Sequence, residues 1–176
     1  HKLEVTQVGG DGINVNSGAD FGGIRLTDNS HSYAIRNASN MFFIYDVTNT
    51  TQRVTLDGTG NLFVAKSSSS VSTDGVELLS TGFVRATVDG DTVLQLNRRT
   101  SDGTLINFRK DGSSVGSIAS EGGDALVIQG GSTSGSGFLF HPTAGNINPA
   151  RNGAKIDNTI DLGRSTHRFK DLYLSG

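Results

Sequence analysis

The chain has 176 residues, enough for one ordinary domain or two small ones, and a formal net charge of −2. This balance lacks the basic excess that binding to a phosphate backbone needs, so nucleic acid is not an expected partner. The absence of Cys excludes disulfides and thiolate metal sites, and no apolar stretch is long enough to span a bilayer, so no membrane insertion is expected. The 24 Gly residues, with abundant Ser, Thr and Asn, favour turn-rich β structure. Because the chain begins at His1, we expect it to be a fragment.

The first third predicts five short strands, each bounded by Asn, Asp, Ser or Gly. They are Gly22–Asp28, Ser32–Ala38, Asn40–Val47, Gln52–Gly58 and Gly60–Lys66. The stretch "KSSSSVSTDG" that follows is of low complexity and is typical of a connector. We therefore expect a module boundary at this stretch.

The segment from Asp91 to Gly130 predicts an antiparallel meander of four further strands. They are Thr92–Arg98, Thr104–Lys110, Ser114–Ala119 and Ala125–Gln129. Asp-Gly occurs six times in the chain, and this pair favours tight hairpin turns because both residues tolerate a positive φ. The connections of the meander contain Asp102-Gly103, Asp111-Gly112 and Gly122-Gly123.

The last part of the chain contains the Gly- and Ser-rich stretch Gly130–Gly137 and both prolines, Pro142 and Pro149. Since Pro cannot donate a hydrogen bond to a central ladder, this part is expected to be largely irregular. The sequence thus predicts an all-β fold of short antiparallel strands and meanders with irregular loops. Its parts are an N-terminal β module (residues 1–66), a Ser-rich connector (67–75), a β-meander module (76–130) and an irregular C-terminal segment (131–176).

Candidate catalytic groups are few, because only three acids are Glu and six of the Asp residues precede Gly in turns. Glycoside cleavage generally uses two carboxyl groups across a sugar-binding groove. The pairs Asp20 and Asp28, or Asp89 and Asp91, are the ones that fit such a role by proximity. Acidic residues beside turns are mostly solvated and capping, so we expect no enzymatic activity, no catalytic residue and no cofactor.

The four histidines, His1, His31, His141 and His167, have none of the spacings of metal-binding motifs. No metal site is therefore expected. In a threefold assembly one histidine that points at the axis becomes three ligands, and His141 and His167 are the ones to inspect for this case.

Receptor contact is expected from loops, because loops carry variable recognition on rigid scaffolds. The polar loops are Asp28–Tyr33, Thr48–Gln52 and Gly130–Gly137. The residues predicted to contact a receptor are His31, Tyr33 and Arg36, which lie in or beside the first of these loops.

The closing segment "DNTIDLGRSTHRFKDLYLSG" resembles a junction found in bacteriophage tail fibres and tailspikes, directly before an endosialidase-type C-terminal intramolecular chaperone. The residues that match the junction are Leu162, Gly163, Arg168, Phe169, Asp171, Leu172 and Tyr173. Met41–Val64 and Leu105–Ile118 are also similar to segments of such fibre proteins. The similar pieces cover about one third of the chain, and the junction is the most specific of them.

The resemblance implies a homotrimer in the phage virion, outside the cell, which binds a glycan or protein receptor on the host surface. It also implies a C-terminal chaperone that is released by self-cleavage just beyond such a junction. Gly176 is then a cleavage end or an arbitrary boundary, and the sequence leaves both open. Two alternatives to an adhesive fibre remain, a polysaccharide-degrading tailspike fragment and a purely structural shaft or collar segment.

Trimerisation is also expected on physical grounds, because many short strands with few large apolar residues leave each chain a limited core. In "KDLYLSG", Leu172 and Leu174 share one face of an extended chain and Tyr173 the other. We expect Phe169, Leu172 and Leu174 to pack against neighbouring subunits and to clamp the end of the trimer.

Overall fold

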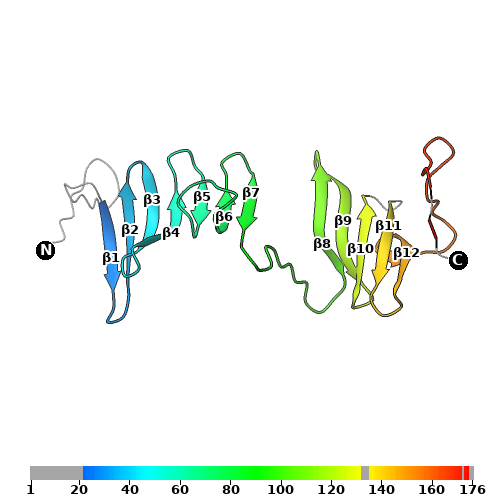
Figure 1. The fold of residues 1–176 in the computed structure, drawn as a ribbon, viewed down its shortest axis with the longest axis horizontal. Coiled ribbons are helices and arrows are strands. Elements are labelled where there is room, and N and C mark those ends of the chain that lie inside the picture. Colours follow the sequence, from blue (N-terminus) through cyan, green and yellow to red (C-terminus); the bar gives the residue numbers. More distant parts are fainter. Residues whose placement is uncertain (1–21, 132–134, 172, 175–176) are drawn as a thin grey trace. The chain divides into compact units, whose positions relative to one another are not determined.

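The structure is a computed structural model that describes residues 22–131, 135–171 and 173–174. These residues form 13 strands and no helix, which confirms the predicted all-β class (Figure 1). The chain divides into two compact units, residues 1–95 and 96–176, and each unit holds one antiparallel sheet. The predictions that concern His1, Asp11, Asp20, Leu172 and Gly176 fall on residues outside the described part.

The first sheet is a seven-stranded meander in which every strand pairs with its neighbours in the chain. Its strands are β1 (Gly22–Thr27), β2 (Ser32–Ala38), β3 (Met41–Asp46), β4 (Thr51–Leu56), β5 (Leu62–Val64), β6 (Gly75–Leu78) and β7 (Val84–Thr87). The five strands predicted in the first third of the chain are therefore confirmed, with small shifts at their ends. Short polar connections allow this order, because antiparallel neighbours need only a tight turn between them.

Two turns explain how the local sequence fixes the register of this sheet. Ser39 and Asn40 join β2 to β3 with φ values of 51° and 61°, as a two-residue turn with positive φ at both positions requires. In the turn from β4 to β5, Asp57 Oδ1 accepts the backbone N–H groups of Thr59 and Asn61, each at 2.9 Å. The N–H of Asn61 is the main cause that lowers the pKa of Asp57, to about 2, because it favours the ionised carboxylate.

The predicted boundary at residues 67–75 differs from the structure. This Ser-rich stretch joins β5 to β6, which are hydrogen-bonded neighbours in one sheet. The two compact units divide instead between Gln95 and Leu96. Low complexity suggested a linker, but a loop between paired strands can have the same composition when its ends are held by side chains of the sheet.

The second sheet is a six-stranded meander with the order β13-β12-β11-β10-β9-β8. Its strands are β8 (Gly103–Lys110), β9 (Ser113–Glu121), β10 (Ala125–Gly130), β11 (Ser136–His141), β12 (Asn146–Arg151) and β13 (Ala154–Lys155). Three of the four strands predicted for the meander correspond to β8, β9 and β10. Asp111 and Gly112 form the two-residue turn from β8 to β9, with φ values of 48° and 78°.

The predicted strand Thr92–Arg98 is wrong, since these residues contain no strand. Its apolar residues are exposed, with accessibilities from 46% at Leu96 to 66% at Leu94. Alternation of apolar residues indicates which side chains share a face, but a strand also needs a partner edge. As a result Asp102-Gly103 lies at the start of β8 and closes no hairpin. Among the described Asp-Gly pairs, only those at Asp57 and Asp111 lie in hairpin turns.

The prediction of an irregular segment from residue 131 onward is wrong for residues 136–155, which form β11, β12 and β13. Pro149 lies within β12, and its carbonyl accepts the N–H of Ile156 at 3.1 Å. In an antiparallel strand the N–H and C=O of one residue point to the same side. The missing N–H of Pro149 therefore lies on the side where β13 pairs with only Ala150 and Arg151, at the sheet edge.

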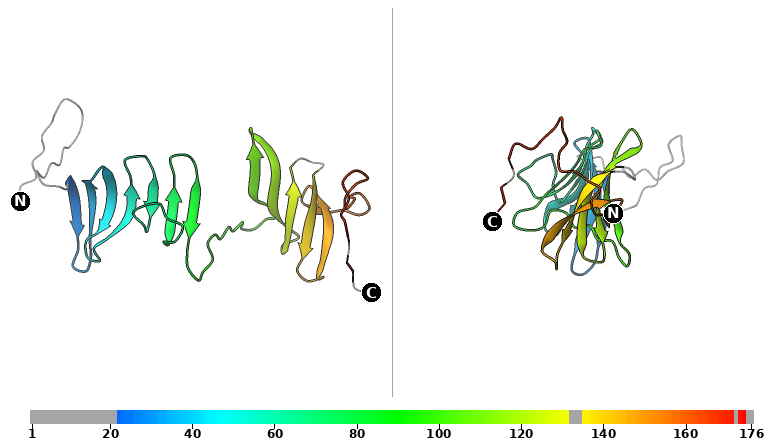
Figure 2. Two further views of the ribbon diagram at one scale, coloured as in Figure 1. Left: turned by 45° about the horizontal axis from the view of Figure 1, so that its top comes forward. Right: turned by 90° about the vertical axis from the view of Figure 1, so that its right-hand side faces the viewer.

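Each sheet is a single row of neighbouring strands, and strands contact chiefly their partners in that row (Figure 2). In the second sheet a cluster of small and aliphatic side chains is buried on one face. It consists of Ala119, Ala125, Val127, Leu139 and Ala150. Rows of exposed large apolar residues lie on one face of each sheet, and these two faces form part of the candidate site.

Candidate functional site

A row of apolar side chains crosses all seven strands of the first sheet on one face. Cross-strand pairing places its members directly opposite one another: Ile24, Ile35, Ile44, Val54, Val64, Val76 and Ala86. A second row on the same face continues from β3 to β7 through Phe42, Leu56, Leu62, Leu78 and Val84. We call this surface the first apolar face.

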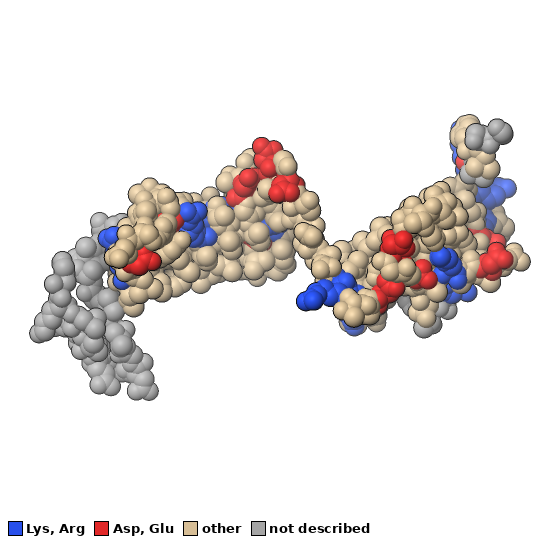
Figure 3. Space-filling model, turned by 90° about the horizontal axis from the view of Figure 1, so that it is seen from below, with Lys and Arg blue, Asp and Glu red and all other residues tan. Residues whose placement is uncertain are grey.

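The first apolar face is exposed in the single chain. Ile24 is 52% accessible, Phe42 44% and Val84 64%. Single apolar residues on a surface are normal, but contiguous apolar patches of this breadth mark an interaction surface. Charged side chains form separate spots in the view of Figure 3 and leave wide uncharged areas on both units.

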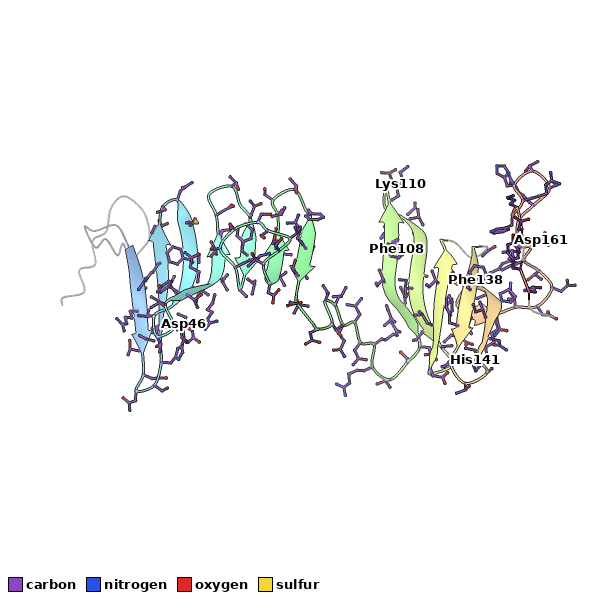
Figure 4. All side chains as sticks on the ribbon, viewed as in Figure 1. Asp46, Phe108, Lys110, Phe138, His141 and Asp161 are labelled. Carbon is purple, nitrogen blue, oxygen red and sulfur yellow. The ribbon has the colours of Figure 1, made fainter. Side chains whose placement is uncertain are left out.

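The second sheet has a corresponding surface, which we call the second apolar face. Cross-strand pairs connect Ile106, Ile118, Ile128, Phe138 and Pro149 in one row across β8 to β12. Leu126, Phe140 and Ile147 form a shorter row on the same face. Phe138 is 51% accessible and Ile147 61%. Figure 4 labels Phe108 and Phe138, which belong to β8 and β11 of this sheet.

The opposite face of the first sheet carries buried polar groups. Thr55 and Glu77 are completely inaccessible there, next to Phe63, which is 2% accessible, and Asp46 at the end of β3 is also completely inaccessible. A buried carboxylate is costly unless it is paired and hydrogen-bonded. Both acids meet this condition.

Asp46 lies at the end of β3 that leads into the β3–β4 turn (Figure 4). Asn49 donates its backbone N–H to Oδ1 at 3.0 Å, and Arg53 Nη2 donates to Oδ2 at 2.6 Å. His31 Nε2 lies 2.9 Å from Oδ1. Burial alone would raise the pKa of Asp46, but the hydrogen bonds from Asn49 and Arg53 and the positive charge of His31 outweigh it and hold the pKa well below its usual range. Asp46 therefore fixes the turn and is not poised as a general acid or base.

The predicted receptor contacts His31, Tyr33 and Arg36 do not form one patch. The rings of His31 and Tyr33 are 4.7 Å apart, and Tyr33 pairs with Leu26 at the edge of the first apolar face. The Arg36 guanidinium lies 4.2 Å from the ring centroid of Tyr45. Because Tyr33 and Arg36 are an odd number of positions apart in β2, they face opposite sides of the sheet.

Glu77 anchors the Ser-rich loop to the sheet. Lys66 Nζ donates to Oε1 at 2.8 Å, Ser69 Oγ to Oε2 at 2.8 Å, and the Ser70 N–H to Oε1 at 2.9 Å. Arg85 completes the set at 3.1 Å from Oε2. Hydrogen bonds from Lys66 and Ser70, opposed by burial and helped by Ser69 and Arg85, lower the pKa of Glu77 to about 2. Glu77 was not identified as a structural anchor from the sequence. The available signal is a single acidic residue between two apolar ones, Val76 and Leu78.

A groove of about 500 Å³ lies on this polar side of the first sheet, between the β3–β4 turn and the Ser-rich loop. Tyr45, Thr51 and Gln52 line one side, and Ser67 and Ser68 line the other. The predicted loop Thr48–Gln52 thus borders the groove. We call it the hydroxyl groove.

A second groove, of about 470 Å³, is apolar and lies on the second apolar face. Ile128, Phe138 and Pro149 contribute from the sheet, and Ile160 and Leu162 contribute from the C-terminal segment. The segment that resembles the fibre junction therefore begins against this face.

The rest of the predicted junction motif is exposed in the single chain. Arg164 and His167 form an isolated β-bridge, and Gly163 before it has a φ of 87°. Phe169 is 66% accessible and Tyr173 89%. The other predicted positions are Leu162 and Leu174, with 63% and 79% accessibility, Arg168, which is also exposed, and Leu172, which lies outside the described residues.

Of the carboxylates considered for catalysis, Asp28 and Asp91 accept backbone hydrogen bonds, and Asp20 lies outside the described residues. Asp28 Oδ1 accepts the N–H groups of Ser30 and His31, each at 2.7 Å, and thus caps a turn. Asp91 accepts the N–H of Thr92 in the connection between the sheets. The described residues contain no group of three or more His, Asp or Glu side chains that could hold a metal ion.

No protein family model, curated protein or solved structure matches the chain. Within the described residues no helix is long and apolar enough to cross a membrane. The candidate sites therefore depend on the geometry of the two apolar faces and of the hydroxyl groove.

Proposed function

We propose that this chain is one subunit of a homotrimeric β-structured fibre, the distal part of a bacteriophage tail fibre that attaches the virion to its host without enzymatic activity. The observation that carries the proposal is the first apolar face. A row of seven paired apolar side chains is left open by its own chain. Burial of each large side chain is worth roughly 1.5 to 3 kcal/mol, so association with like surfaces is strongly favoured.

The second apolar face supports the same arrangement. It repeats the pattern on an independent sheet and meets the segment that resembles the fibre junction. In the proposed trimer each apolar face packs against the same face of the neighbouring subunits, and Phe169, Leu172 and Leu174 clamp the end of the trimer. The chaperone implied by the resemblance would follow this end and be released after assembly.

Assembly is tested by light scattering coupled to size-exclusion chromatography at dilute concentration. The expected mass is three times the chain mass of 18.4 kDa. Ile44→Asp, which places a charge on the first apolar face, should abolish the trimer. Val71→Asp is the matched control, because Val71 is 68% accessible in the Ser-rich loop and belongs to neither apolar face. A folded wild-type monomer, or a stable dimer of facing sheets, would contradict the trimer.

Attachment is tested separately, by adding labelled trimer to a panel of bacterial strains and measuring retention on cells. We expect retention on some strains and none on others. A trimer that binds no strain would favour the alternative of a structural shaft or collar segment, which the simple repetition of meander sheets also fits.

A further inference from the structure

We propose that the hydroxyl groove binds a neutral, hydroxyl-rich saccharide of a bacterial surface. This inference rests on the proposed attachment function and names the site and the ligand class for it. The groove has a volume of about 500 Å³, within the range of small-molecule sites.

The chemistry of the walls determines the ligand class. The hydroxyls of Thr51, Ser67 and Ser68 have no hydrogen-bond partner within the described part of the chain. A hydroxyl both donates and accepts, as do the hydroxyls of a sugar. Gln52 Oε1 already accepts from Thr55 at 3.3 Å, so its amide nitrogen is the group it can offer to a ligand.

Charge recognition is disfavoured in the groove. Among the described residues that line the groove, the basic one is Lys66. Its side chain is 1% accessible, and its Nζ donates to Glu77 and to the carbonyl of Ser70. No carboxylate lines the groove among the described residues. A neutral ligand is therefore favoured over an acidic or a basic one.

Two residues with unusual backbone conformations border the groove on its two sides. Thr50 in the β3–β4 turn has a φ of 52°, and Ala65 after β5 has a φ of 63°. Positive φ is uncommon for residues other than Gly, and especially for a β-branched one. Strained backbone conformations of this kind occur preferentially at binding sites, where contacts with the surrounding structure hold them in place.

The groove is held in shape before any ligand binds. The Ser-rich wall is fixed by the hydrogen bonds of Ser69 and Ser70 to Glu77. The opposite wall is fixed by the bonds of Asn49 and Arg53 to Asp46. A preorganised site loses less free energy to ordering when it binds.

The groove also stays accessible in the proposed assembly. Tyr45 pairs with Ala34, whereas the next residue pair, Ile44 and Ile35, belongs to the first apolar face. Successive residues of a strand point to opposite faces. When the first apolar face is turned inward, Tyr45 and the groove are on the outer side.

The probe is a printed array of purified bacterial surface oligosaccharides, some neutral and some carrying carboxylate or phosphate groups. Full-length trimer should bind a subset of the neutral spots. Ser68→Tyr fills the groove and should weaken this binding by about tenfold or more, as loss of one or two hydrogen bonds does. Ser72→Tyr is the matched control, since Ser72 is an exposed serine of the same loop that does not line the groove.

The outcomes separate this inference from the proposed function. A trimer that is retained on bacterial cells but binds no neutral spot, or binds only acidic ones, overturns the saccharide class. Equal binding by Ser68→Tyr and the wild type overturns the site. Loss of the trimer in light scattering of the same wild-type sample overturns the fibre proposal, whatever the array shows.

Discussion

The two sheets have the same architecture, but different kinds of side chain stabilise their covered faces. Both are single-layered meanders that expose one apolar face. The first sheet is held by buried ions: Glu77 on its covered face is bonded to Lys66, and Asp46 at the end of β3 is bonded to Arg53. The covered face of the second sheet contains a buried cluster of Ala, Val and Leu side chains with no ionisable group.

This difference separates two ways of stabilising a sheet that has no second layer of its own. Small aliphatic side chains can be buried without polar partners. Buried carboxylates need every lone pair satisfied. Here several of the partners, among them Asn49, Ser69 and Ser70, come from loops, so the ions also fix the loops. The first sheet thus gains preformed loops beside the hydroxyl groove, and it becomes sensitive to acid.

The largest effect is expected in the second sheet, from Leu139→Ala. Leu139 is fully inaccessible, and such truncations cost about 2 to 5 kcal/mol because they leave a cavity. Urea denaturation monitored by hydrogen exchange should show reduced protection in β9 to β12 and unchanged protection in β1 to β7. Leu94→Ala is the control, since Leu94 is 66% accessible and its loss should change little. Equal effects of the two variants would contradict the assignment of this core.

A smaller effect on stability is expected when the pH falls, and it should be larger in the first sheet than in the second. The pKa of Glu77 is lowered from 4.5 to about 2 in the folded chain, so its stabilising contribution is complete above pH 4.5 and is lost as pH falls toward 2. Asp46 acts in the same direction. Calorimetry between pH 7 and pH 2 should show the transition of the first sheet moving down more than that of the second. Glu77→Gln should reduce this shift, and an unchanged shift would exclude Glu77 as its main cause.

Much of the strand layout was predictable from the sequence, and the reason is local. Of the five predicted N-terminal strands, three have large apolar residues at alternate positions and two are short continuous apolar runs, and all have polar turn residues at their ends. Local patterning decides these features. Thr92–Arg98 has the same pattern but no pairing edge, and pairing is not a local property. Pro149 was assigned to irregular structure because the sequence does not reveal which side of a strand is left unpaired.

The candidate site was less predictable for the same reason. Thr48–Gln52 was expected to be a polar loop, and it borders the hydroxyl groove. Its opposite wall comes from the Ser-rich stretch, which the composition suggested to be a linker. The two meet because β5 pairs with β4 and Glu77 holds the loop, and neither contact follows from the residues of the loop itself.

The smallest loss of stability is expected from replacing a turn glycine, and it should be the same in both sheets. This comparison tests whether the sheets differ only in how their covered faces are stabilised. Gly60 in the β4–β5 turn and Gly112 in the β8–β9 turn have φ values of 86° and 78°. An added Cβ would meet only Ser80 at 3.5 Å in the first case and nothing within 4 Å in the second. Gly60→Ala and Gly112→Ala should therefore each cost roughly 1 to 2 kcal/mol, the penalty of a left-handed conformation for an L-residue. Urea denaturation of both variants measures these costs. Both should be the same at pH 7 and pH 4, because Asp57, whose carboxylate holds the β4–β5 turn, has a pKa lowered to about 2 and stays ionised over this range. A cost at Gly60 that grows on acidification would mean that this turn is coupled to the buried ions of the first sheet.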